Sequence, residues 1–309
     1  MASKVTQIVA QEFASTFCQV LSKLEKSGGP EWTRPWKGGK KSDFFIPGMP
    51  HNGMSKRMYT GSNVAILYFK AIARGWGNKW FTFNQIRELG LQFNDESEKK
   101  HTKILHFKTY EISKEKRVDG RDSGVSVRYY RLFNESQLID PSGSDKWKEP
   151  LLKESDDTIV SNAVSKGAKI YHGGDSAFYE PLRDRVVIPE KSLFLSEDSY
   201  FATLYHELAH WTGEKSRLNR DYPSPEEDNA SKKDQSINIM KKYAWEELVA
   251  ELASAFLCSQ TKRECMVNHV AYLKVWKERA EKDPMKLMQA GKAASDAALF
   301  LLKNDNKKN

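Results

Sequence analysis

The residues with the clearest chemical potential lie in the run "HELAH", where His206 and His210 stand four residues apart. On a helix this spacing places both imidazoles on one face, where they can bind a single Zn²⁺ at about 2.0–2.1 Å. Glu207 follows the first histidine. In this pattern the carboxylate is not a ligand but the general base that takes a proton from the attacking water. The competing interpretation is a packed helix with histidines at its edge, because five-residue motifs also occur by chance.

A catalytic zinc site needs three protein ligands and keeps its fourth position open. The run "YAWEELVAELASAFL" supplies carboxylates for the third ligand. Glu247 and Glu251 lie one helical turn apart, so one can bind the metal while the other orients a histidine. Glu246 competes from an adjacent face, and all three also fit a solvated acidic face. We predict Glu247 as the third ligand, with Glu251 and Glu246 as orienting groups or alternative ligands.

Positive charge is concentrated in the first half of the chain. Residues 1–140 hold 23 lysines and arginines against 14 acidic residues, whereas the remainder holds 26 against 27. Single-strand binding without sequence preference needs cations for the phosphates and exposed aromatic rings for stacking. The residues that combine these properties, and that we predict to bind DNA, are Trp32, Arg34, Trp36, Lys37, Lys40, Lys41, Lys56, Arg57, Tyr59, Arg74 and Lys79. We expect four further aromatics to be core residues: Trp76, Trp80, Phe81 and Phe83.

Helices and short strands must position these groups. Apolar periodicity and capping residues predict helices near 5–25, 62–74, 82–89, 154–166, 199–211, 243–260, 264–280 and 284–303. β-branched and aromatic runs predict strands near 102–112, 125–134, 168–174 and 185–189. We expect Ser62 or Asn63, Thr82, and Asp198 or Ser199 as helix caps, with Gly75 and Gly213 as stops. The polar residues 221–242 predict a long surface loop. Together these elements predict an α+β fold.

Turn-forming and charged residues cluster between 140 and 150 and predict a domain boundary there. We expect a DNA-binding domain over residues 1–140, a linker over 141–150 and a metal-binding domain over 151–309. No run of about 18 apolar residues is present, so we expect no membrane partner. The three cysteines form no CxxC pair, which favours a cytoplasmic protein.

From about residue 5 to 300 the chain resembles ArdC-type antirestriction proteins. The matching runs are "RPW", "HNGMSKRMYTGSNVAIL", "ARGWGNKWFTFNQIRELG", "RLFNESQ", "HGGDSAFYEPLRDRVVIP", "YFATLYHELAHWTGEKSRLNR" and "YAWEELVAELASAFLC". The resemblance implies a single-stranded-DNA-binding domain followed by a zincin metallopeptidase domain. It also implies His206 and His210 as ligands, Glu207 as the catalytic carboxylate and a glutamate of "EELVAE" as third ligand. The run "DRVVIP" would be the edge strand beside the cleft.

Such proteins are carried by conjugative plasmids and related mobile elements and protect incoming DNA from host restriction. The resemblance therefore predicts single-stranded DNA as partner, Zn²⁺ or another divalent metal such as Mn²⁺ as cofactor, and a host restriction component as substrate or partner. Two alternatives stay open. One is a DNA-coating protein whose metal domain is structural or regulatory. The other is a metalloprotease that uses its basic half to dock an acidic protein.

Overall fold

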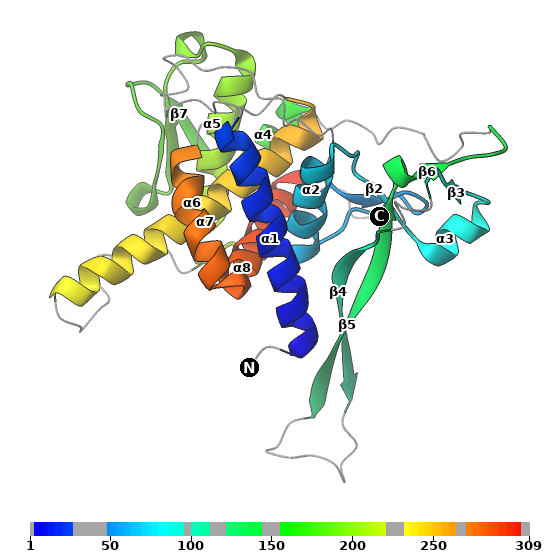
Figure 1. Cartoon of the computed structure of the whole chain (residues 1–309). Helices are drawn as coiled ribbons and strands as arrows, with labels where there is room; N and C mark the ends of the chain where they lie inside the picture. The colour runs from blue at the N-terminus through cyan, green and yellow to red at the C-terminus, as the bar shows by residue number, and fades with distance from the viewer. Residues whose placement is uncertain are drawn as a thin grey trace.

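The computed structural model describes residues 3–26, 48–95, 100–111, 122–143, 155–220, 232–263 and 270–303. Its helices are α1 (Lys4–Lys26), α2 (Ser62–Arg74), α3 (Phe83–Glu88), α4 (Asp156–Ser165), α5 (Glu197–Trp211), α6 (Lys232–Thr261), α7 (Val270–Lys282) and α8 (Pro284–Leu302). Its strands are β1 (His51–Asn52), β2 (Lys79–Thr82), β3 (Gln92–Phe93), β4 (Thr102–Glu111), β5 (Ser123–Asn134), β6 (Leu138–Ile139), β7 (Lys169–His172), β8 (Phe178–Glu180) and β9 (Arg185–Ile188). The prediction of an α+β fold is confirmed (Figure 1).

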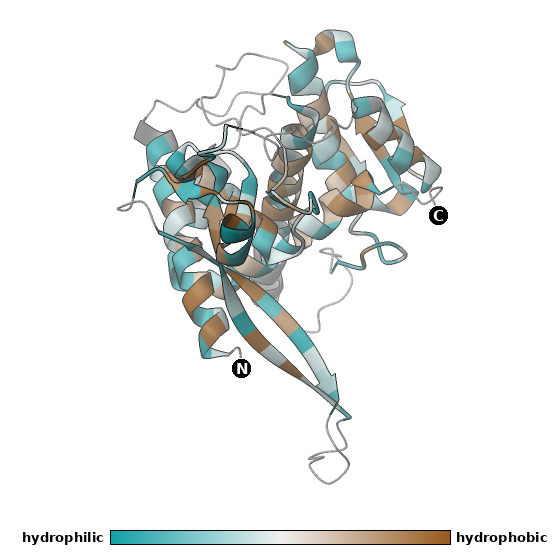
Figure 2. Ribbon diagram, turned by 90° about the vertical axis from the view of Figure 1, so that its right-hand side faces the viewer, coloured by the Kyte–Doolittle hydropathy of each residue, from teal (hydrophilic) through white to brown (hydrophobic). Residues whose placement is uncertain are grey.

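The strands form separate small sheets on either side of a helical centre. The first sheet has the order β1-β2-β5-β4, and within it β4 and β5 form a long antiparallel hairpin that stands out from the body (Figures 1 and 2). Strands β3 and β6 form a separate pair. The third sheet has the order β7-β9-β8, with β7 parallel and β8 antiparallel to β9. The expectation that "DRVVIP" is an edge strand is therefore wrong: it forms β9, the central strand. The edge strand β8 is only three residues long, too short for a clear period-two signal.

The helices from the two ends of the chain share one hydrophobic core. Buried side chains of α1, among them Phe13 and Phe17, belong to the same cluster as Leu287 and Leu301 of α8. Helix α8 also packs against α2 through Gly291, where a Cβ atom would lie 2.6 Å from the Cβ of Ala65. This core joins segments on both sides of the predicted boundary, and the predicted domain limits themselves stay a prediction.

Two predicted helix ends agree with the structure. The hydroxyl of Thr82 accepts a hydrogen bond from the backbone of Gln85 in a capping box. Gly75 ends α2 with a φ of 66° in the left-handed region that favours glycine.

Other predicted ends are wrong. Ser196, not Asp198 or Ser199, caps α5, and α2 begins after Gly61 without a side-chain cap. Asn63 instead exchanges two hydrogen bonds with the backbone of Leu105 in β4, at 2.8 and 2.9 Å. A cap candidate that bonds a neighbouring strand cannot be recognised from local sequence.

Residues 232–242 are helical, which corrects part of the predicted loop over 221–242. Helix α6 starts at Lys232 and continues to Thr261. The segment 232–242 contains no glycine or proline, and its lysines and glutamine are good helix formers. Residues 221–231 lie outside the described part of the chain. Among the described helices, none combines the length and apolarity needed to cross a membrane.

We predict that Gly291→Val lowers the free energy of unfolding by about 1–3 kcal/mol, because the new side chain overpacks the contact between α8 and α2. Gln289→Val places the same residue at an exposed position of α8 and serves as the control, with an expected cost of about 0.5 kcal/mol. Urea denaturation measures both. Equal stability of the two variants would contradict the tight α2–α8 contact.

Candidate metal centre

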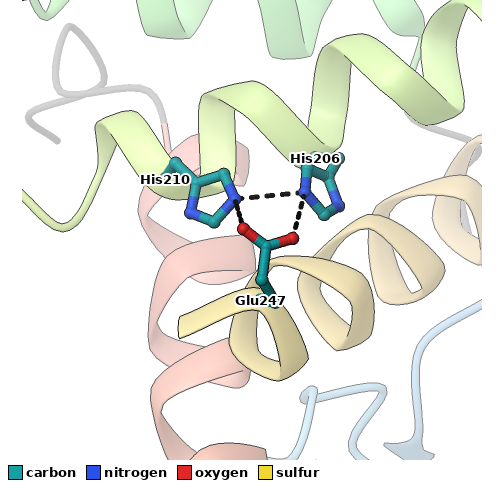
Figure 3. A group of neighbouring side chains, drawn as sticks. All are labelled: His206, His210 and Glu247. Atoms are coloured by element: carbon teal, nitrogen blue, oxygen red, sulfur yellow. Dashed lines mark hydrogen bonds and ion pairs between the residues drawn. The ribbon is translucent and has the colours of Figure 1, made fainter. Parts of the chain in front are cut away.

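Two neighbouring helices bring His206, His210 and Glu247 together (Figure 3). The Nε2 atoms of His206 and His210 lie 3.1 Å apart. The Glu247 carboxylate spans them, with Oε2 at 3.5 Å from one Nε2 and Oε1 at 3.4 Å from the other. Ligand atoms about 2.0–2.1 Å from a tetrahedral Zn²⁺ are separated by about 3.3 Å. These separations are close to that value, so the three side chains are placed to hold one divalent ion.

The position of the site follows from close packing between α5 and α6. Leu204 and Leu208 of α5 are buried, as are Ala250 and Ala253 of α6. The hydroxyl of Ser254 donates a hydrogen bond of 2.7 Å to the carbonyl of Ala202 across the interface. The small residues of the "ASA" run allow this approach, so that the polar faces of the two helices meet.

The two remaining glutamates of α6 stand behind the histidines. An oxygen of Glu251 lies 3.1 Å from Nδ1 of His206, and Oε1 of Glu246 lies 3.4 Å from Nδ1 of His210. Each imidazole thus has a carboxylate on the side away from Glu247, an arrangement that fixes ring orientation and raises ligand basicity. The geometry favours Glu247 among the three predicted candidates. The ligand roles themselves stay a prediction.

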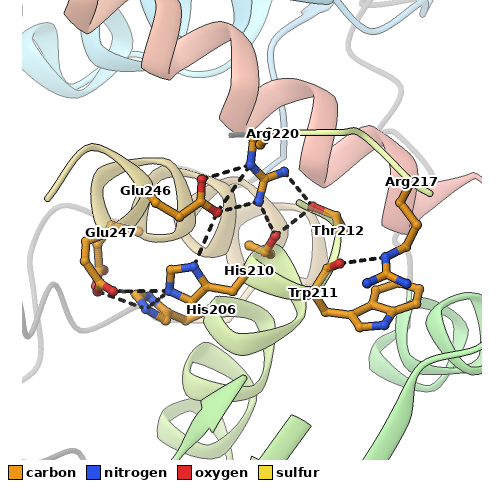
Figure 4. Close-up of polar contacts among 10 residues, drawn as sticks. His206, His210, Trp211, Thr212, Arg217, Arg220, Glu246 and Glu247 are labelled. Atoms are coloured by element: carbon orange, nitrogen blue, oxygen red, sulfur yellow. Dashed lines mark hydrogen bonds and ion pairs between the residues drawn. The ribbon is translucent and has the colours of Figure 1, made fainter. Parts of the chain in front are cut away.

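Arg220 is a residue that sequence analysis missed. Its guanidinium contacts Glu246 with Nη2–Oε1 at 2.7 Å and Nε–Oε2 at 3.0 Å, and it also donates to the Ala209 carbonyl and the Thr212 hydroxyl (Figure 4). A Cβ atom on Gly213 would lie 2.8 Å from Nη2, so this glycine leaves room for the guanidinium. Helix α5 ends at Trp211 with Thr212 as its C-cap, and Gly213, the predicted stop, is the next residue. A cation close after the end of a helix was the available signal.

Glu207 lies beside the site and is buried, with 7% of its surface exposed. It accepts a hydrogen bond from the backbone of Tyr179 in β8, and burial raises its pKa. The Tyr179 hydroxyl in turn donates to Asp184, which pairs with Arg217 at 2.6 Å. Arg217 also donates to the Trp211 carbonyl and lies over the Trp211 ring at 4.1 Å (Figure 4). The edge strand beside the motif helix is therefore β8.

The carboxylates of the site shift the pKa values of its two histidines. Burial alone would lower the pKa of His210, but the Glu246 and Glu247 carboxylates outweigh it and raise the pKa to about 9. His206 follows the same pattern: burial opposes the charged form, yet Glu251 and Glu247 raise its pKa well above the ordinary value. The histidine contacts lower the pKa of Glu247 despite its burial.

The structure places only part of the predicted DNA-binding set. Trp32, Arg34, Trp36, Lys37, Lys40 and Lys41 lie outside the described residues. Arg57 and Arg74 are exposed, and Tyr59 packs partly against the core. Lys56 is half-buried, and Lys79 is 3.6 Å from Glu135. Their roles stay a prediction.

The four aromatic residues expected in the core differ in their burial. Trp80 and Phe81 are fully buried as expected, and Trp76 is half-buried against Trp80. Phe83 is 51% exposed, so the core expectation is wrong there. It is the first residue of α3, after the Thr82 cap, and the buried part of β2 has already ended.

Comparison with known proteins gives a separate family match for each half of the chain. Residues 9–135 match the N-terminal domain of anti-restriction factor ArdC, and residues 157–293 match a zincin-like metallopeptidase family. The chain thus combines a match to the ArdC N-terminal domain with a match to a zincin-like metallopeptidase domain. Crystal structures of the antirestriction ArdC protein from plasmid R388 are similar over nearly the whole chain at 26% identity. The metal-free form has a TM-score of 0.64 and covers 94% of this chain and 96% of that one. The Mn(II)-bound form has a TM-score of 0.66 and covers 99% and 100%.

Some relatives of the chain are much longer proteins. The chain is 29% identical over 97% of its length to a DNA primase TraC of Escherichia coli, and it spans 28% of that protein. For a second Escherichia coli TraC the values are 27% identity, 96% of this chain and 20% of the relative. The protein y4eC of Sinorhizobium fredii (strain NBRC 101917 / NGR234) is 28% identical over 91% of this chain and 88% of its own length. The chain thus spans less than a third of the two primases.

The raised histidine pKa values predict how metal affinity depends on pH. Below about pH 9 the imidazole of His210 holds a proton in the metal-free protein, and a metal must displace it. Affinity should therefore rise by about tenfold per pH unit for each displaced proton and level off above the pKa. Competition against a chelator between pH 7 and 9 measures this slope. A flat profile over that range would contradict the raised pKa values.

Removal of the Arg220 guanidinium should weaken metal binding. Arg220→Ala leaves Glu246 buried without its cation and frees the His210 ring, so we expect affinity to fall by about 10–100-fold. Lys215→Ala removes an exposed cation from the same segment and should leave affinity unchanged. Titration with Zn²⁺ and with Mn²⁺ compares them. A loss of the same size in both variants would assign the effect to net charge.

Proposed function

We propose that the chain is an antirestriction protein that binds single-stranded DNA through its first half and cleaves a protein through its second. The observation that carries the catalytic part is the His206–His210–Glu247 cluster with Glu207 beside it, held by the backbone of β8. Similarity to ArdC antirestriction proteins in both sequence and fold supports the biological role. A host restriction component is the substrate or partner that this role suggests.

The residues of the chain divide the work. His206, His210 and Glu247 would hold a divalent ion, which lowers the pKa of a water and polarises a peptide carbonyl when bound. Glu207 would take the proton of the attacking water and pass it to the leaving amine. Its burial and raised pKa suit this task, because a general base transfers protons best when its pKa is near the working pH. Glu251 and Glu246 would keep the two imidazoles aligned.

Two histidines and one carboxylate form a donor set typical of catalytic zinc sites, so we propose Zn²⁺ as the metal. Imidazole and carboxylate also bind Mn²⁺, and a Mn(II)-bound relative exists, which makes Mn²⁺ the alternative.

A DNA-coating protein with a regulatory metal site is the second candidate. The fold is about equally similar to a metal-free and a Mn(II)-bound ArdC structure, with TM-scores of 0.64 and 0.66. This similarity argues against a metal that is needed to hold the fold together. It leaves catalysis and regulation as the two roles to separate.

The deciding experiment compares wild type with Glu207→Gln in cells that receive restriction-sensitive DNA. Glutamine keeps the size of the buried side chain and can still accept the Tyr179 hydrogen bond, but it cannot act as a base. We expect loss of protection, with metal affinity and DNA binding of the purified variant unchanged. Glu190→Gln, an exposed position, is the control and should protect fully. Full protection by Glu207→Gln would instead favour the DNA-coating function.

A further inference from the structure

The β4–β5 hairpin is longer than its place in the sheet requires. Ten residue pairs join the two strands, from Thr102–Leu132 to Glu111–Ser123. The neighbouring strand β2 pairs β5 only at Leu132, Phe133 and Asn134. The remainder is a two-stranded ribbon that projects from the body in both views (Figures 1 and 2). Isolated two-stranded ribbons are marginally stable in water, so this length serves something other than the core.

The register sorts the ribbon side chains onto two faces. Opposite residues of an antiparallel pair point to the same side, so one face carries Tyr130, His106, Arg128, Lys108 and Tyr110, which we call the Tyr110 face. The opposite face carries apolar and aromatic side chains together with two cations next to the body and one carboxylate at the far end: Lys103, Arg131, Leu105, Tyr129, Phe107, Val127, Thr109, Val125, Glu111 and Ser123. Ile104, which pairs with Tyr130 on the same side of the ribbon, is buried with Leu67 and Ala71 of α2. The exposed part of this side therefore begins at Tyr130.

The Tyr110 face combines exposed aromatic rings with cations. Tyr110 and Tyr130 are 51% and 48% exposed, and His106, Lys108 and Arg128 are exposed between them. No acidic residue lies on this face within the paired residues of the two strands. The His106 and Tyr130 rings are in contact, with centroids 5.0 Å apart.

Gly124 gives Tyr110 its orientation. It lies directly opposite Tyr110, and a Cβ atom there would be 2.6 Å from the Tyr110 ring. The ring therefore lies across the backbone of the partner strand, which leaves its outer side open. A flat ring supported by backbone is suited to stack on a planar ligand.

We propose that the Tyr110 face is a binding surface for single-stranded nucleic acid, with Tyr110 and Tyr130 stacking on bases and Lys108 and Arg128 contacting phosphates. Base–aromatic stacking and phosphate contacts along one track are the combination that such ligands require. This inference rests on the proposed DNA-binding function and assigns it to residues outside the basic runs at 32–41 and 56–79. The exposed cations of an edge strand also prevent aggregation, but that role does not need the two tyrosines.

The test measures binding of the full-length protein to fluorescently labelled oligothymidylate across a range of salt concentrations. Tyr110→Ala with Tyr130→Ala should weaken binding about tenfold or more. Phe107→Ala with Tyr129→Ala removes two aromatics from the opposite face of the same strands and should leave affinity unchanged. Thermal melting checks that both variants keep the fold.

Lys108→Ala with Arg128→Ala should reduce the slope of log K against log salt by about 1.4, because each phosphate contact on a single strand contributes about 0.7. Lys282→Ala with Lys286→Ala removes the same charge at exposed positions of α7 and α8 and should leave the slope unchanged.

Four results would overturn the inference. Tight binding by both hairpin variants would place the DNA elsewhere while the proposed function stands. Equal losses in the Tyr110-face variants and their controls would indicate a nonspecific effect of charge or stability. Displacement of the oligonucleotide by polyglutamate at matched charge would indicate that the surface binds any polyanion. Failure of wild type to bind any oligothymidylate would reject the DNA-binding part of the proposed function together with this surface.

Discussion

The structure depends on the burial of many charges between α5 and α6. Four carboxylates and two imidazoles meet there, and Arg220 is the cation that pairs with one of the carboxylates. The free energy needed to bury several unpaired charges exceeds the net stability of a folded domain, so these groups must neutralise one another. Two imidazolium protons carry the same charge as one divalent ion. Exchange of these protons for the divalent ion proposed above would therefore leave the total charge of the buried cluster unchanged.

The arrangement of the remaining parts follows from this cluster. Ser254 and the alanines of α6 bring the helices close enough for the glutamates to reach both sides of each imidazole. Arg217 anchors the end of α5 and, through Asp184 and Tyr179, fixes β8 against the motif helix. Each of these contacts is made by α5 itself or by a residue that contacts α5.

The metal-binding residues can be predicted from the sequence more readily than the contacts that hold them in place. The spacing of His206 and His210 and the one-turn offset of Glu247 and Glu251 are local properties, and a helix converts them directly into geometry. The contacts of Arg220 and Asn63 join elements distant in the chain, so no local pattern announces them. The central place of β9 depends on a three-residue partner strand that lies between turns. Caps near Ser196 were ambiguous because Ser196, Asp198 and Ser199 are all good capping residues, and tertiary packing decides among them.

The shared core of α1, α2 and α8 has a consequence for inheritance. A recombination event that cut the gene between its two halves would leave α1 and α2 without the apolar surface of α8, and neither product would retain its core. Exchange with other genes should therefore transfer the whole segment as one block. The relatives are consistent with this constraint, since 97% of the chain aligns within an Escherichia coli primase that is more than three times as long.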